Sequence, residues 1–151
     1  MDKDTNVATL ETLTTTLIDS VNGYEESAKQ TENGRLKQMF DECAADRRRV
    51  ADDLRSAIRS LGGDPPEDGS FMGKTHQTWL DLKAAVTGRD DEAIVNSVEA
   101  GEDYLKEKFE TALGSDELSG EARQAAERAY QSVRSGHDRM SSLKHQMEAQ
   151  G

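Results

Sequence analysis

Two glutamates and a histidine in the second half of the sequence form the pattern closest to a chemical site. Glu99 and Glu102 are three residues apart, so on a helix they share one face. If their segment forms a hairpin with the last helix, His137 lies about one turn from the level of Glu99. Two carboxylates and an imidazole can hold one zinc or iron ion. Glu99, Glu102 and His137 are therefore the candidate metal ligands.

A di-iron centre requires ligands that this sequence does not supply. In di-iron helical bundles, two helices each provide a Glu and two others each provide a Glu-x-x-His motif. The residues three positions before His76, His137 and His145 are Gly73, Arg134 and Ser142. Since no Glu-x-x-His motif occurs, we predict neither a di-iron centre nor ferroxidase activity.

An internal layer of ion pairs is the interpretation of these charged residues that we prefer. Arg47 occupies a position where the helical pattern calls for an apolar residue, and hairpin geometry places Asp19 level with it. We expect these two to pair, and Glu99 or Glu102 to pair with arginine and histidine from the last helix. Arginines compete with a metal for carboxylates, so we expect no metal or cofactor, with one zinc or iron ion as the alternative. The predicted polar core comprises Asp19, Arg47, Glu99, Glu102, Arg134 and His137.

Four long segments carry apolar residues at every third or fourth position, which predicts four amphipathic helices. The expected helices run from about 4 to 30, 35 to 61, 91 to 113 and 120 to 149. Asn33-Gly34 and Gly62-Gly63 should end the first two helices, because Asn and Gly accept the left-handed conformation. The short linkers make the helices of each hairpin antiparallel neighbours. The sequence therefore predicts one all-α domain over residues 1–151, a four-helix bundle.

The connection between the second and third long helices should contain a short helix from Met72 to Thr87, ended by Gly88. This connection is long enough to cross the whole bundle, but a plain up-down order also remains open. His76 and Trp79 share one face of the short helix and are expected to pack against the bundle.

Composition excludes several classes of function. The formal net charge of -11 opposes binding to nucleic acid and to anionic lipid surfaces. No segment has the roughly 20 apolar residues of a membrane span, and the first residues lack the pattern of a signal peptide. Cys43 is the single cysteine, expected to be a small buried apolar residue. We predict an acidic, soluble, cytoplasmic protein.

Several short motifs occur in an order that resembles a known family. They are Gly23-Tyr24, Leu61-Gly62-Gly63, Gly69-Ser70, Gly73-x-x-His76-x-x-Trp79, Leu82-Lys83, Asp90-Asp91, Glu99-x-Gly101-Glu102-Asp103 and His137-Asp138. Together they resemble an uncharacterised, mostly proteobacterial family of ferritin-like four-helix-bundle proteins, a domain of unknown function. The resemblance implies a ferritin-like fold and a bacterial origin, and it implies no activity.

The sequence favours a non-catalytic helical-bundle protein, either stress-associated or a protein-interaction module. Its partner would be a second copy or another protein, and Phe71, Met72 and Trp79 are the best candidates for an apolar contact surface. The alternative is a ferritin-like metal-binding protein with a degenerate, non-di-iron site at mid-bundle.

Overall fold

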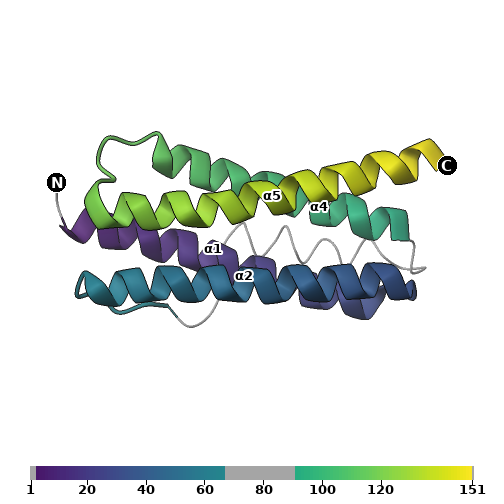
Figure 1. Cartoon of the computed structure of the whole chain (residues 1–151), viewed down its shortest axis with the longest axis horizontal. Helices are drawn as coiled ribbons and strands as arrows, with labels where there is room; N and C mark the ends of the chain where they lie inside the picture. The colour runs from purple at the N-terminus through teal and green to yellow at the C-terminus, as the bar shows by residue number, and fades with distance from the viewer. Residues whose placement is uncertain (1–2, 67–90, 151) are drawn as a thin grey trace.

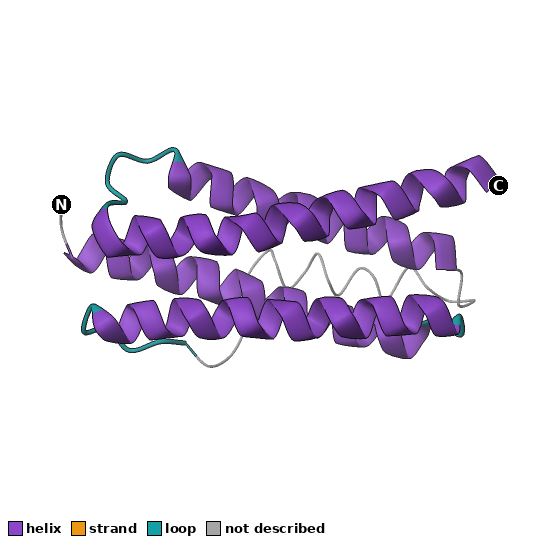
Figure 2. Ribbon diagram, in the orientation of Figure 1, coloured by secondary structure: helices purple, strands orange, loops and turns teal. Residues whose placement is uncertain are grey.

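The computed structural model describes residues 3–66 and 91–150, and the structural statements below concern these residues. They form four long α-helices: α1 (Lys3–Gln30), α2 (Gly34–Ser60), α4 (Asp91–Leu113) and α5 (Gly120–Gln150) (Figure 1). The described part of the chain contains no β-strand (Figure 2). The predicted all-α bundle and the bounds of its long helices are confirmed. The short helix predicted from Met72 to Thr87, its break at Gly88, and Trp79 lie outside the described residues.

The turn between α1 and α2 differs from the prediction. Asn33 has an extended backbone, and its side chain accepts hydrogen bonds from the backbone N–H groups of Arg35 (2.9 Å) and Leu36 (3.1 Å). It therefore caps the start of α2 instead of ending α1 with a left-handed residue, and Gly34 is already helical. The predicted glycine stop is found at Gly62, whose φ of 85° ends α2.

Hydrogen bonds between helix ends define the connectivity. At one end of the bundle Asn6, near the start of α1, accepts from the backbone N–H of Ser119, just before α5 (3.2 Å). At the other end Thr31, just after α1, donates to Asp91 at the start of α4 (2.6 Å). Since α2 also begins at this second end, α2 and α4 run in the same direction, as Figure 1 shows. The connection between them must link opposite ends of the bundle, so the plain up-down order is excluded.

The four helices surround one core. α1 contacts α2 and α4, and α5 contacts the same two helices; α1 and α5 also touch across the shorter diagonal, and α2 and α4 stand at the other two corners. The predicted apolar stripes face the centre and form two clusters of buried side chains. One cluster contains Leu10, Leu54 and Phe109 near one end, and the other contains Phe40 and Ile94 near the opposite end. Between the two clusters lies a layer of buried polar side chains.

Candidate functional site

The polar layer is centred on an arginine in the apolar stripe of α2. Arg47 is 1% exposed, at the position where the helical spacing calls for an apolar residue. Its Nη1 donates to Oε1 of Glu102 (2.7 Å) and its Nη2 donates to Oε2 (2.5 Å). Glu102, in α4, is fully buried. Two parallel bonds of this kind match the fork of a guanidinium to a carboxylate, and they join the two diagonal helices through the bundle axis.

Helix α1 completes the surroundings of the arginine. Ser20 Oγ accepts a third hydrogen bond from Nη1 of Arg47 (2.7 Å). The guanidinium carbon lies 5.7 Å from the ring centre of Tyr24, within the range of a cation–π contact. The aromatic ring and the hydroxyl thus support a charge that would otherwise be costly to bury.

Helix α5 contributes a glycine to the layer. A Cβ atom at Gly136 would lie 2.3 Å from Nη2 of Arg47 and 3.2 Å from Oε2 of Glu102. Real Cβ atoms do not approach so closely, so any other residue at position 136 would displace the guanidinium. All four helices therefore shape the place of one ion pair.

The ion pair also determines protonation in its surroundings. Burial works against the charge of Arg47, but the negative charge of Glu102, the hydrogen bonds to Glu102 and the neighbouring Tyr24 and Cys43 together outweigh it and raise the pKa of the guanidinium. Burial, reinforced by the charge of Glu102, raises the pKa of Tyr24 well above its usual value. At neutral pH the centre of the bundle therefore holds a charged arginine beside a neutral phenol.

The predicted pairing of Asp19 with Arg47 is wrong. Asp19 is buried, at 3% exposure, but the carboxylate that holds Arg47 is Glu102. The prediction compared residues at equal height within one hairpin. An arginine side chain is long enough to reach past its hairpin neighbour to the diagonal helix.

The predicted partners of Glu99 and Glu102 on α5 also need correction. Arg134 is exposed and takes no part in the buried layer, because Val133 and Gly136 occupy the inward face of α5 at this level. Glu99 lies 3.5 Å from Nζ of Lys144, and His137 contacts two aspartates. The predicted ion-pair layer has Arg47 and Glu102 as the ion pair at its centre.

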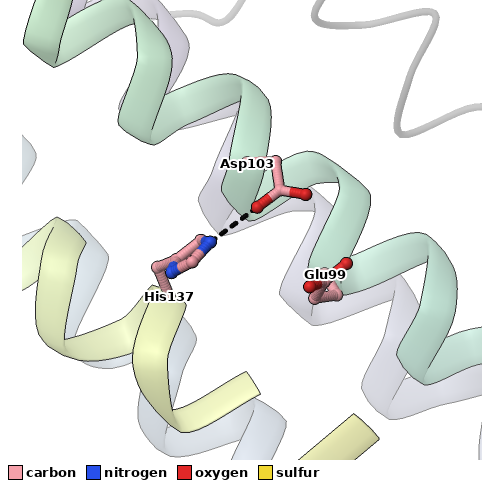
Figure 3. Close-up of side chains that lie close together, drawn as sticks. All are labelled: Glu99, Asp103 and His137. Atoms are coloured by element: carbon pink, nitrogen blue, oxygen red, sulfur yellow. Dashed lines mark hydrogen bonds and ion pairs between the residues drawn. The ribbon is translucent and has the colours of Figure 1, made fainter. Parts of the chain in front are cut away.

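A second group of polar side chains lies at the rim, on the seam between α4 and α5 (Figure 3). One donor atom each from Glu99, Asp103 and His137 lies within 4.8 Å of the other two. Nε2 of His137 is 2.6 Å from Oδ1 of Asp103. Glu99 and Asp103 are four residues apart, so they stand on the same face of α4.

The rim cluster differs by one residue from the predicted ligand set. The structure brings Glu99 and His137 together as predicted, but Glu102 turns toward the bundle axis and its neighbour Asp103 takes its place. The i, i+4 spacing of Glu99 and Asp103 was a signal in the sequence for this pair, as valid as the i, i+3 spacing of Glu99 and Glu102.

Two further charged side chains adjoin the rim cluster. Oδ1 of Asp138 lies 3.3 Å from Nδ1 of His137, on the ring nitrogen that faces away from Asp103. Nζ of Lys144 lies 3.5 Å from Oε1 of Glu99. The imidazole is thus flanked by carboxylates on both nitrogens, and Glu99 already has a cation beside it.

A polar cleft of about 480 Å³ lies between α2 and α5. Cys43 forms part of its wall, and Arg139 bridges it with a hydrogen bond to Glu42 (3.1 Å). Burial raises the pKa of the Cys43 thiol. The expectation that Cys43 is a small buried residue is confirmed, since it is 7% exposed.

The fold and the polar layer define the class of this protein: an all-α four-helix bundle with a buried ion pair at its centre. The chain belongs to the family described as Domain of unknown function (DUF2383), whose model matches residues 5–115. No curated protein matches the chain. The family match includes Arg47 and Glu102 and stops before α5, so Gly136 and His137 lie beyond it. Among the described helices, none is both long and apolar enough to cross a membrane.

Proposed function

We propose that this chain is a non-catalytic helical-bundle protein that works through its surface, as a protein-interaction module. One observation carries the proposal: the carboxylate at the centre of the bundle is held by both amino groups of an arginine. In bundle proteins with chemistry in the core, inward carboxylates hold metals or move protons. Here Glu102 is neutralised by Arg47, so the central position serves packing and helix register.

The other buried groups at the centre support the same conclusion. The raised pKa of Tyr24 and the raised pKa of Cys43 keep both groups neutral at physiological pH. A general base or nucleophile requires a pKa near the working pH. Neither group has one.

The distribution of charge supports an interaction role. Outside the buried pair of Arg47 and Glu102, α4 carries six acidic and two basic residues, whereas α2, at the diagonal corner, carries five acidic and six basic ones. Two copies can therefore place the acidic face of α4 against the nearly balanced face of α2, instead of against a second acidic face. We therefore propose that the interaction partner is a second copy of this chain.

Measurement of molar mass at several protein concentrations, by light scattering after gel filtration, tests self-association. We expect the mass to rise with concentration, and the rise to be smaller in Glu107→Lys, which reverses an exposed charge on α4. Trp79→Ala probes the apolar contribution predicted from the sequence. A monomer at every concentration would remove self-association from the proposal.

A ferritin-like metal protein is the second candidate function, and the order of the helices favours it. Two antiparallel hairpins with α2 parallel to α4 match the arrangement of ferritin-like folds, which have one long crossover. The ligands predicted from the sequence, Glu99, Glu102 and His137, cannot all serve, because Arg47 holds Glu102. Bacterial origin, cytoplasmic location and a stress-associated role stay predictions.

A further inference from the structure

The rim cluster combines donors of the kinds that divalent transition metals prefer. Glu99 and Asp103 provide two carboxylates from α4, and His137 provides an imidazole nitrogen from α5. Figure 3 shows Asp103 and His137 pointing toward each other across the space between the two helices, with Glu99 one turn away on α4. Two carboxylates and one histidine form a ligand set for zinc and related ions that leaves a coordination position to water.

We propose that Glu99, Asp103 and His137 bind one divalent transition-metal cation of the zinc type. This metal site goes beyond the proposed interaction role and does not depend on it. The cation would link α4 to α5 outside the closed core, at a place the buried arginine does not reach.

The separations of the donor atoms fit such a cation. Ligand distances of 2.0–2.1 Å in a tetrahedral site place neighbouring donor atoms about 3.3 Å apart. Nε2 of His137 and Oδ1 of Asp103 are now 2.6 Å apart, and all three donors lie within 4.8 Å of one another. The required distance falls between these values. Modest rotations of the exposed Asp103 side chain and of the largely buried Glu99 and His137 side chains would therefore form the site.

The orientation of the imidazole also fits. Oδ1 of Asp138 lies 3.3 Å from Nδ1 of His137, which fixes the ring so that Nε2 faces Asp103. A carboxylate on the second ring nitrogen is the usual support of a metal-bound histidine, because it sets the tautomer and increases the basicity of the ligand.

Lys144 is an internal competitor for this site. Its ammonium lies 3.5 Å from Glu99 and is partly exposed, so it can move into solvent when a cation arrives. The competing arrangement keeps the contact of His137 with Asp103 and the ion pair of Lys144 with Glu99, and no metal binds. The two structures respond in opposite ways to removal of the lysine. Loss of Lys144 weakens the ion pairs but frees a ligand for the metal.

Zinc titration of the full chain by calorimetry, after treatment with a chelator, tests the proposal. We expect saturable binding of one equivalent, and a rise of about 5 °C in Tm when zinc is at 100 times its Kd. Both Asp103→Asn and His137→Gln should weaken binding at least ten-fold, since each removes a ligand. Lys144→Gln should tighten binding several-fold.

Two matched controls distinguish this site from general surface binding. His145→Gln removes an exposed histidine from the same helix, and Glu107→Gln removes an exposed carboxylate one turn beyond Asp103. Both should leave the zinc affinity unchanged. Absence of saturable binding, or binding that persists in His137→Gln and Asp103→Asn while those variants retain their helical circular dichroism, overturns the proposal. A protein that stays monomeric would contradict self-association but not the metal site.

Discussion

Glu102 and Asp103 are neighbours in the sequence, and their carboxylates lie in two very different parts of the molecule. Glu102 is fully buried, bonded through both oxygens to Arg47. The Asp103 side chain is 57% exposed, and its Oδ1 contacts Nε2 of His137 on the seam between α4 and α5. A step of one residue rotates a helical side chain by about 100°, which is enough to move a carboxylate from the core to the rim.

The comparison shows how burial decides what a carboxylate can do. In the core, removal from water makes a partner obligatory, and a bidentate arginine saturates the oxygens of Glu102. At the rim, water supports the charge of Asp103, so its contacts can be exchanged at little cost. The buried pair therefore leaves Glu102 no free contact to exchange, whereas the exposed contacts of Asp103 are the ones that our proposed metal ion would replace.

Truncation of the core arginine should have the largest effect on stability. Arg47→Ala leaves the buried charge of Glu102 without its partner, which should lower the free energy of unfolding by about 3–5 kcal/mol. Urea denaturation followed by circular dichroism measures the loss. Arg49→Ala, two residues along the same helix with a side chain 74% exposed, is the control and should be close to neutral. A similar small effect for both arginines would contradict the account of the core.

Addition of one methyl group beside the ion pair should have the next largest effect. Gly136→Ala places a Cβ atom 2.3 Å from Nη2 of Arg47, and such overpacking costs about 1–3 kcal/mol. In an open helix the same substitution stabilises by about 1 kcal/mol, so the sign itself is informative.

Gly34→Ala is the matched control for this substitution. No atom lies within 4 Å of the added Cβ, and α2 begins there. The free energy of unfolding should not fall in this variant. Thermal melts of the two alanine variants should therefore move in different directions. A stabilised Gly136→Ala protein would show that the guanidinium is not held where the structure places it.

Alkaline pH should weaken the fold through the neutral groups of the core. Burial raises the pKa of Cys43 from 9.0 and that of Tyr24 from 10.0, so above about pH 9 the unfolded chain loses protons that the folded chain retains. The unfolded state then binds fewer protons, and the free energy of unfolding falls as the pH rises.

Tyr24→Phe checks this prediction, because it removes the titrating hydroxyl of Tyr24 and leaves the Cys43 thiol in place. Denaturation at pH 8 and at pH 10.5 should show a smaller loss between the two in the variant than in the parent protein. Equal losses would exclude Tyr24 as a cause.

The sequence predicted the elements of this fold well because each depends on local patterns. Apolar spacing defined the four helices, and glycine placed the end of α2 at Gly62. The sequence also marked Arg47 as an unusual residue in an apolar stripe. These signals require no knowledge of how helices pack against one another.

The pairing of charges could not be predicted in the same way. The partner of Arg47 depends on which helices stand at diagonal corners and on the space that Gly136 leaves, both of which are properties of the packed bundle. The choice of Asp103 over Glu102 as the neighbour of His137 depends on the rotation of α4 about its axis. Spacing alone leaves this rotation open, because i, i+3 and i, i+4 are both compatible with one face.

Thermal unfolding of Glu102→Gln and Asp103→Asn, each with and without zinc, tests the contrast between core and rim most directly. We predict that Glu102→Gln lowers the Tm of the metal-free protein and keeps the rise that zinc produces. Asp103→Asn should leave the metal-free Tm nearly unchanged and lose that rise. Loss of the zinc effect in Glu102→Gln, or its persistence in Asp103→Asn, would contradict the assignment of the two carboxylates.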